Sequence, residues 1–363
     1  MFKLKKIKNN GVRLGLLKTP HGILSTPLFM PDATRGFLKS LNIKDIKDTG
    51  TKAMVVNTFH LYLQPGIKII KQAGGIHRFM NWSGPLLSDS GGFQIFSLVH
   101  KNSKMGKIFD EKVSFKSPLD GSWHDLTPEK SIQIQFDLGV DMMVCLDDCP
   151  PHDLTSEKMK TAVDRTIFWA LKSKKEYERQ IKKRKINKNN RPLLFAVIQG
   201  GTDIHLRRYC AQKLVAIGFD GYSFGARPVD KNGKFLKKVL QETANCIPPE
   251  APRFALGVGT PDDIKRSALL GWDMFDCVIP TREGRHGRLF LNVNSEKYKT
   301  VNILNSKFSS NFKVVNKNSF LLELKENSLA YLHHLFRLKE SLGQRLASLN
   351  NLEFYQKKIK DLY

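Results

Sequence analysis

The chain has few cysteines and no long apolar segment. No apolar run approaches the roughly 20 residues that a membrane-spanning helix needs. The first residues, MFKLKKIKNNGVRLG, lack the apolar core of a secretory signal peptide. The five cysteines are odd in number and scattered, at Cys145, Cys149, Cys210, Cys246 and Cys277. Because disulfide bonds are rare in the cytoplasm, we expect a cytoplasmic protein with reduced thiols and no membrane contact.

Acidic residues are also scarce relative to basic ones. The 363 residues include 34 Asp and Glu against 59 Lys and Arg, for a formal net charge of +25. Such an excess is typical of nucleic-acid-binding proteins, because basic side chains that neutralise phosphates release the condensed counterions. The alternative is a generally lysine-rich composition without functional meaning. The hydrophobic fraction of 41% is ordinary for a folded globular protein.

Eight short apolar runs recur along the chain, mostly with helix-like segments between them. The runs read as continuously apolar rather than alternating, which is typical of parallel strands that are covered on both faces. The length suffices for one large barrel. We therefore predict an α/β protein, a (β/α)8 TIM barrel, with strands at 27–30, 53–56, 85–88, 141–146, 193–198, 221–225, 254–258 and 274–279.

Helical periodicity is clearest over 156–184 and 205–217. Residues 172–191 are rich in Lys and Arg. They form either the solvated end of an outer helix and its loop, or a nucleic-acid contact.

The C-terminal part follows a different pattern. Residues 283–327 have little helical period, so we predict an inserted subdomain of small strands there. Residues 328–363 are expected to be helices that close the single catalytic domain. A leucine stripe predicts one packed helix over 328–347, through Leu329, Leu332, Leu335, Leu338, Leu342 and Leu346.

Polar residues lie at the ends of several predicted strands. Asp89, Asp147 and Gln199 follow three of them, and Asp276 lies inside the last. The carboxyl ends of TIM-barrel strands build the active site. A single Asp after a strand is more often a helix N-cap, but four such groups favour a site. Glycines beside Asp89 and Gln199 would let backbone amides approach a flat ligand.

Several sequence motifs of this chain resemble those of a known family. They are NTFHLYLQPG (57–66), LLSDSGGFQIFSL (86–98), CLDDCP (145–150), IQGG (198–201), FDGYSFGA (219–226), LGVGTPDDI (256–264) and MFDCVIPTREGRHG (274–287). In this order and spacing they resemble the tRNA-guanine transglycosylase family, also called queuine tRNA-ribosyltransferases, of the bacterial type. The resemblance runs from about residue 12 to the C-terminus.

The resemblance implies a (β/α)8 fold and a pentosyl transfer in queuosine biosynthesis. Guanine at the wobble position of the tRNAs for aspartate, asparagine, histidine and tyrosine is exchanged for a 7-deazaguanine, preQ1. By resemblance, Asp276 is the nucleophile that bonds to ribose C1′. Asp89 is then the proton carrier that assists the departure of guanine and deprotonates the incoming base.

The resemblance also implies a base-binding set. Asp147 would accept hydrogen bonds from N1–H and the exocyclic amine, and Gln199 and the backbone near Gly225 would donate to O6. Phe93 and Leu256 would lie on the two faces of the ring. The remaining members of the expected set are Ser90, Cys149 and Ala226.

Three arginines after the last predicted strand resemble residues that bind RNA in the family. They would reach phosphates around the flipped nucleotide, although a solvated basic loop is the alternative. These residues are Arg282, Arg285 and Arg288.

The chain departs from the family where members bind a structural zinc ion through three cysteines and a histidine. None of the residues at those positions is an ordinary zinc ligand, so we predict no metal and no cofactor. We expect the neighbouring His333 and His334 to be helix residues, and leucine packing to replace the ion. The positions are Ser319, Leu321, Leu324 and Asn350.

A second departure lies in the base pocket. Where members commonly read Gly-Gly-Leu, this chain has Gly225-Ala226-Arg227. If Arg227 points inward, it would repel the cationic aminomethyl group of preQ1; if it points outward, it would face RNA. By resemblance, Val229 favours preQ1 over the bulkier queuine.

Three alternatives to the function stay open. The protein could salvage queuine, act on DNA or another RNA position, or be a non-catalytic RNA-binding paralogue. Retention of both Asp89 and Asp276 speaks against the last. The expected partners are tRNA and a free guanine or 7-deazaguanine base, with a homodimer as a further possibility.

Overall fold

The computed structural model describes residues 1–150, 154–230, 232–293 and 297–363. Its centre is an eight-stranded parallel sheet in the order β4-β14-β13-β12-β11-β10-β6-β5. The ends of the sheet meet through a parallel bridge between Asp32 and Val55, and Ala33 N–H donates to the Val55 carbonyl at 2.7 Å. The (β/α)8 prediction is therefore confirmed. The strands are β4 (Leu28–Pro31), β5 (Met54–Val56), β6 (Leu86–Ser88), β10 (Met142–Val144), β11 (Leu193–Ile198), β12 (Gly221–Phe224), β13 (Arg253–Ala255) and β14 (Met274–Cys277).

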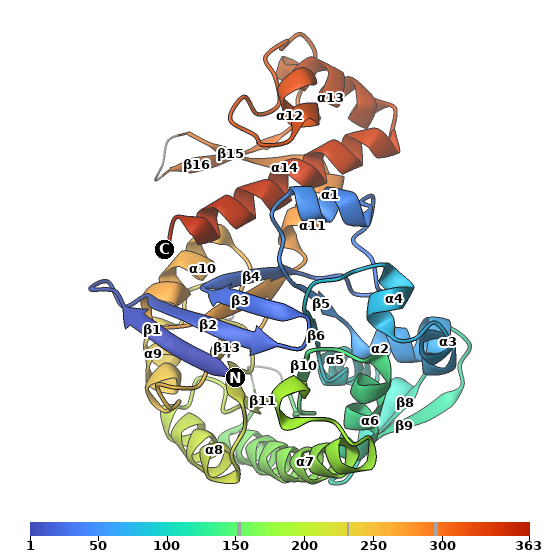
Figure 1. Ribbon diagram of the computed structural model, residues 1–363, viewed down its shortest axis with the longest axis vertical. Coiled ribbons are helices and arrows are strands. Elements are labelled where there is room, and N and C mark those ends of the chain that lie inside the picture. The colour runs from blue at the N-terminus through green and yellow to red at the C-terminus, as the bar shows by residue number, and fades with distance from the viewer. Residues whose placement is uncertain (151–153, 231, 294–296) are drawn as a thin grey trace.

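Helices surround this barrel (Figure 1). The two helices predicted most clearly, 156–184 and 205–217, are observed as α7 (Ser156–Lys183) and α8 (Ile204–Ile217). The others around the barrel are α1 (Ile43–Asp48), α2 (Thr58–Leu61), η1 (Tyr62–Gly66), α3 (Ile67–Gln72), α4 (Ile76–Met80), α5 (Gly92–Lys101), α6 (Pro128–Leu138), α9 (Lys237–Asn245), α10 (Pro261–Leu269) and α11 (Ile279–Arg285).

Alternating side chains of the strands fill the barrel and pack against the helices. On β11, Phe195 and Val197 belong to the interior cluster, whereas Ala196 and Ile198 pack outward under the helices. Because both faces are covered, the strand is buried at every residue. This explains why the parallel strands read as continuous apolar runs.

Two antiparallel sheets were not predicted from the sequence. The first, β1 (Phe2–Ile7), β2 (Arg13–Thr19) and β3 (Gly22–Thr26), lies across the barrel in Figure 1. Its Phe2, Leu17 and Leu24 join the interior cluster, so it closes one end of the barrel. The second sheet comprises β7 (Gly106–Ile108), β8 (Val113–Lys116) and β9 (Trp123–Leu126), with η2 (Ser103–Met105) before it.

The basic segment 172–191 spans the end of α7, a turn and η3 (Lys188–Asn190). Several of its cations have acidic partners. Arg184 lies 2.5 Å from Asp137 and Arg191 lies 2.6 Å from Asp220. These pairs favour the interpretation as the end of an outer helix.

The predicted single helix over 328–347 was wrong. The chain forms α13 (Leu329–Arg337) and α14 (Ser341–Lys360), separated by a turn at Lys339, which has a left-handed φ of 60°. That turn rotates the leucine stripe, so Leu338 is 59% exposed and Leu342 is 38% exposed. Before α13 lie the antiparallel pair β15 (Arg288–Asn292) and β16 (Tyr298–Asn302), then η4 (Ser306–Phe308) and α12 (Leu322–Glu326). Of the predicted insertion 283–327, residues 294–296 lie outside the described residues.

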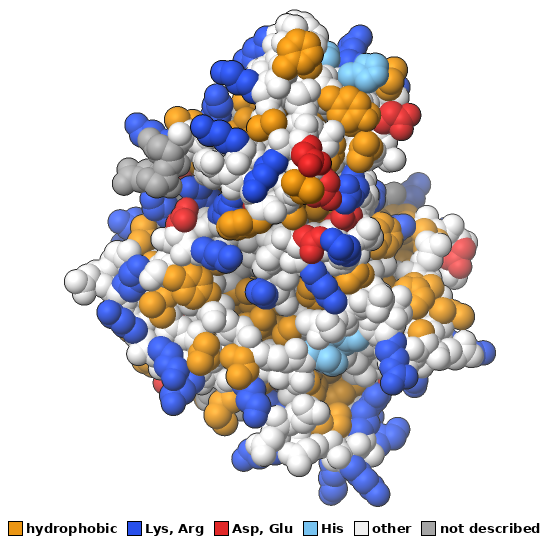
Figure 2. Space-filling view, turned by 45° about the horizontal axis from the view of Figure 1, so that its top comes forward, with side chains coloured by type: hydrophobic (Ala, Val, Ile, Leu, Met, Phe, Trp, Pro, Cys, Tyr) orange, Lys and Arg blue, Asp and Glu red, His pale blue; other side chains and the backbone are white. Residues whose placement is uncertain are grey.

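None of the described helices is long and apolar enough to cross a lipid bilayer. Lysine and arginine side chains are spread over the face seen in Figure 2, with far fewer acidic ones among them. The excess of positive charge is therefore distributed across this face, which suits general attraction of a polyanion.

Candidate active site

The carboxyl ends of the strands bring the predicted polar residues to one rim of the barrel. Asp89 follows β6 directly, Gln199 follows β11 directly, and Asp147 comes three residues after the end of β10. Asp276 lies within β14. Since all eight strands are parallel, these side chains belong to the same end of the barrel.

Asp89 is held by donors from Asn57 and Thr58, which follow β5, and from Gly91 in its own loop. Its Oδ1 accepts the Thr58 N–H at 2.8 Å and the Gly91 N–H at 3.1 Å. The side-chain amide of Asn57 donates to Oδ2. Burial raises the pKa of Asp89 to about 7, although these backbone hydrogen bonds oppose the rise. A carboxyl group with this pKa can give and take a proton near neutral pH.

Asp276 is buried and its Oδ1 accepts the Gly257 N–H at 2.7 Å. Burial raises the pKa of Asp276 to about 6. The charge of Asp276 in turn contributes to the raised pKa of Asp89. The two carboxyl groups are thus electrostatically linked, with Asp276 the more readily ionised.

A third carboxyl group, Asp32, was missed in the sequence. It comes directly after β4 and hydrogen-bonds the carboxyl group of Asp276. A signal was available, because Asp32 comes two residues after the end of the apolar run 27–30, whereas Asp89 follows its own run directly. The intervening Pro31 hid the pattern.

Asp147 and Gln199 form the second polar centre of the rim. Gln199 Nε2 donates to Asp147 Oδ2 at 2.7 Å, and the Ser90 hydroxyl also hydrogen-bonds Asp147. Burial raises the pKa of Asp147 to about 6. Cys149 interacts with Gln199 and with the Ala226 backbone, and burial raises the pKa of its thiol to about 12, so it stays protonated.

Gly225 is required by its contact with Gln199. A Cβ atom on Gly225 would lie 2.4 Å from Gln199 Nε2. Any side chain there would displace the amide from Asp147. This is the close approach that a glycine permits.

Arg207, which the sequence gave no reason to single out, holds the strand ends and loops that carry these groups. Its guanidinium is fully buried and donates to the carbonyls of Ile198, Gly201 and Gly225 at 2.8–2.9 Å. The cation also lies 4.0 Å from the centroid of the Phe224 ring. Arg207 thereby ties the end of β11 to the end of β12.

The other predicted site residues are more open. Phe93, in the first turn of α5, is 60% exposed, and Leu256 is half-buried at the edge of the interior cluster. Ala226 is half-buried and has a φ of 89°, which is unusual for a residue with a side chain. Arg227 is exposed and Val229 pairs in an isolated bridge with Phe235.

The three arginines after β14 lie on α11 and at the start of β15. Arg282 and Arg288 are exposed and lie 3.5 Å and 3.3 Å from Glu283, respectively. Arg285 is half-buried, and burial lowers its pKa, as does the nearby charge of Arg282.

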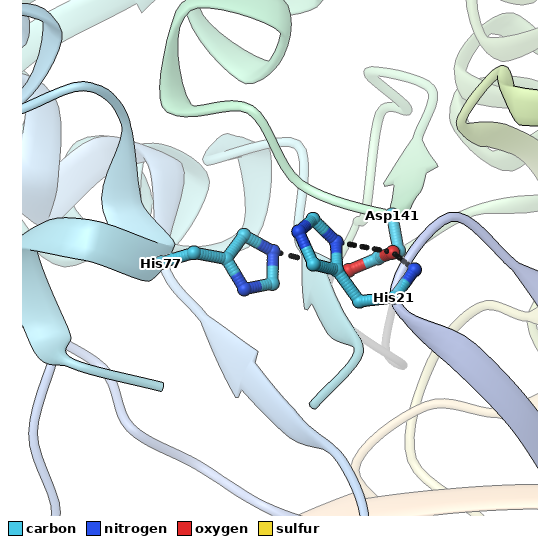
Figure 3. A group of neighbouring side chains, drawn as sticks. All are labelled: His21, His77 and Asp141. Atoms are coloured by element: carbon cyan, nitrogen blue, oxygen red, sulfur yellow. Dashed lines mark hydrogen bonds and ion pairs between the residues drawn. The ribbon is translucent and has the colours of Figure 1, made fainter. Parts of the chain in front are cut away.

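A separate cluster lies at the other end of the barrel, where Asp141 directly precedes β10. It consists of His21, His77 and Asp141 (Figure 3). Asp141 accepts the backbone N–H groups of His21 and Leu86, each at 2.8 Å, and lies 2.9 Å from His21 Nδ1 and 3.1 Å from His77 Nε2. The two rings stack with centroids 3.8 Å apart. One ligand atom from each of the three side chains lies within 4.8 Å of the other two, so the cluster could hold a metal ion. Through its hydrogen bonds to His21, Asp141 also anchors the β2–β3 turn.

The four positions that the sequence resemblance matches to zinc ligands, Ser319, Leu321, Leu324 and Asn350, are buried together in a packed core. Leu321 and Leu324 belong to an apolar cluster with Leu349. Ser319 donates to the buried carboxylate of Glu353 at 2.6 Å. Asn350 Nδ2 donates to the Phe290 carbonyl at 3.0 Å. A hydroxyl, an amide and two leucines lack the thiolate and imidazole donors that usually hold structural zinc, and Glu353 is already hydrogen-bonded.

Comparison with known proteins shows similarity over nearly the whole chain. A family model described as Queuine tRNA-ribosyltransferase matches residues 8–362. The queuine tRNA-ribosyltransferase of Thermoanaerobacter sp. (strain X514) is 40% identical over 351 residues, which cover 97% of this chain and 89% of that relative. The one from Methylacidiphilum infernorum (isolate V4) is 39% identical over 364 residues, covering 99% and 94% respectively. With a match over nearly its whole length, the chain belongs to the queuine tRNA-ribosyltransferase family.

Proposed function

We propose that this protein exchanges guanine in tRNA for a 7-deazaguanine through a covalent bond between Asp276 and ribose C1′. The observation that carries the proposal is the pair of buried, linked carboxyl groups Asp89 and Asp276 beside the Asp147–Gln199 centre. Asp89 and Asp276 are suited to proton transfer and nucleophilic attack. Asp147 and Gln199 are suited to hydrogen-bonding the polar edge of a purine. The finer assignment rests on resemblance alone. The family resemblance implies the wobble position, and Val229 favours preQ1 over queuine, whereas Arg227 would disfavour preQ1 if it pointed inward.

In the first half of the reaction, an oxygen of ionised Asp276 attacks C1′ and the C1′–N9 bond of guanosine breaks. Guanine leaves with the electron pair of that bond and receives a proton from the Asp89 carboxyl group. The carboxylate suits the oxocarbenium-like carbon, as in retaining glycosidases. Gly257 N–H holds one oxygen of Asp276 and so limits its rotation.

In the second half, the incoming base gives its N9 proton to the Asp89 carboxylate. N9 then bonds to C1′ and the bond between C1′ and Asp276 breaks, which restores the Asp276 carboxylate. Asp89 ends the cycle protonated, as it began. One group can serve in both directions because its pKa lies near neutrality.

Base selection falls to the Asp147–Gln199 centre. An ionised Asp147 has acceptors for N1–H and the exocyclic amine of guanine, which adenine cannot provide in that pattern. The amide of Gln199 carries two hydrogens, of which one is donated to Asp147, and we expect the other to be donated to O6 of the bound base. A base that leaves these buried groups unpaired is strongly rejected. The exposed ring of Phe93 offers a stacking face for any base.

The exposure of Arg227 yields a prediction about tRNA. We expect Arg227→Leu to weaken tRNA binding roughly threefold to tenfold for every base, and to lower the salt dependence by about one phosphate contact. Arg227→Lys retains the charge and should behave nearly as the unmodified protein. Kinetic constants for guanine and preQ1 at several salt concentrations measure this. Selective improvement with preQ1 in the Leu variant would place the guanidinium at the base instead.

We also propose that the protein folds without zinc, because a serine, two leucines and an asparagine occupy the family's ligand positions. We expect less than stoichiometric zinc by elemental analysis, and an unchanged unfolding midpoint after chelation, since no metal binding would be coupled to folding. His21→Ala with His77→Ala is the control for zinc bound at the other end of the barrel. One zinc per chain that survives this double substitution would contradict the proposal.

A DNA-acting enzyme and a non-catalytic RNA binder remain the rivals. Base exchange into tRNA measured against duplex DNA separates the first. Any exchange that depends on Asp276 excludes the second.

A further inference from the structure

Asp32 occupies the seam at which the barrel closes. It directly follows β4, whose residues pair with β14 so that Met30 lies opposite Asp276 and Pro31 opposite Cys277. Its N–H donates to the Cys277 carbonyl at 3.4 Å, and it bridges to Val55 of β5. The backbone on both sides therefore fixes Asp32 on the rim beside the nucleophile.

The side chain of Asp32 lacks a donor that would stabilise a negative charge. Among the described residues, none donates a hydrogen bond to its buried Oδ1 atom. Its carboxyl group instead hydrogen-bonds the carboxyl group of Asp276. Two carboxyl groups can share a hydrogen bond only when one of them holds a proton.

The titratable groups that face Asp32 indicate which partner holds the proton. Asp276 and Asp89 both add negative charge near Asp32, and burial, the largest cause, together with these charges raises its pKa well above the usual range. The other titratable neighbour is Cys277, whose pKa burial and the Asp32 charge raise, so it stays a neutral thiol. Asp276 has the Gly257 N–H to stabilise its charge, whereas the buried Oδ1 of Asp32 accepts from none of the described residues.

We propose that Asp32 is a positioning residue that stays protonated and donates its hydrogen bond to Asp276, orienting the attacking carboxylate and stabilising it when it departs from C1′. The inference rests on the proposed function of Asp276. Asp32 neither gains nor loses its proton during the cycle. It acts most in the second half, because a hydrogen bond to the departing oxygen helps the C1′–Asp276 bond to break.

Two substitutions of Asp32 separate this role from others. Asp32→Asn keeps a donor of similar shape but cannot ionise, so we expect guanine exchange within about threefold of the unmodified protein. Asp32→Ala removes the donor. Because a hydrogen bond to a charged group is lost, we expect exchange to fall roughly tenfold to a hundredfold. The acid limb of the pH profile should also move up by about one pH unit, because the hydrogen bond from Asp32 lowers the pKa of Asp276.

The pH profile distinguishes positioning from a merely structural role. A structural role would lower the amount of folded protein but would not move the acid limb of the profile. An Asn variant as inactive as the Ala variant would overturn the proposal, because the charge of Asp32 would then be required. An unmoved acid limb in Asp32→Ala would overturn it as well. Failure of the proposed function is distinguishable, because the unmodified protein would then exchange no guanine at all. If the Ala variant does not fold, the activity of the Asn variant still decides.

Discussion

Asp276→Asn is expected to abolish guanine exchange, lowering it at least about a thousandfold, while tRNA binding stays nearly unchanged. The amide cannot form the bond to C1′, and the two half-reactions both pass through that bond. Asparagine has nearly the volume of aspartate and can still accept the Gly257 N–H, so the rim should keep its geometry. Initial rates of labelled guanine incorporation and a tRNA binding curve measure the two effects.

The covalent intermediate gives the same variant a second readout. The unmodified protein should form an adduct with tRNA that survives a denaturing gel, and Asp276→Asn should form none. Asp164→Asn is a matched control, since it removes a carboxylate from the exposed side of α7, where Lys160 is its partner. An adduct of normal yield in Asp276→Asn would mean that another residue is the nucleophile.

Asp89→Asn is expected to lower exchange by about a hundredfold to ten-thousandfold, the usual contribution of general acid–base catalysis. The reason is that guanine would leave as an anion and the incoming base would keep its N9 proton. Asp89 must be protonated when guanine leaves, so kcat/KM for tRNA in the unmodified protein should fall as pH rises through about 7. Asp276 must be ionised, so the same quantity should rise through about pH 6.

The pH profile of the Asp89→Asn variant tests this assignment apart from its rate. Without the titrating group, the fall on the alkaline side should disappear, whereas the rise on the acid side should persist. The variant should still bind tRNA. If the alkaline limb survives at its original position, another group controls it and Asp89 is not the proton donor.

The barrel was predictable because strands that are buried on both faces appear in the sequence as continuous apolar runs. β11 coincides with the predicted 193–198. Several other strands are shorter than predicted. Their apolar runs continue past the last residue that pairs in the sheet, into the loops that form the rim of the barrel. Thus 254–258 yields only Arg253–Ala255, with a left-handed Gly257 immediately beyond. The sheet β1–β3 was missed because β1 carries alternating lysines and buries only one face.

The place of a polar residue on the rim was predictable where it directly follows an apolar run, as at Asp89 and Gln199. Asp32 was missed because Pro31 separates it from its apolar run. Arg207 could not have been found, because a basic residue in an amphipathic helix is ordinarily solvated, and only the fold brings its guanidinium under three loop carbonyls. The leucine stripe misled for the opposite reason, because its spacing is regular but the turn at Lys339 breaks the helix.

The most direct test of the account is the incorporation of radiolabelled guanine into unmodified tRNA by the purified protein. We expect label to enter the tRNA at the wobble position, with preQ1 competing for the same site and duplex DNA taking up none. Enzyme without tRNA and the Asp276→Asn variant provide the background. Absence of incorporation by the folded, tRNA-binding protein would contradict base exchange as its function.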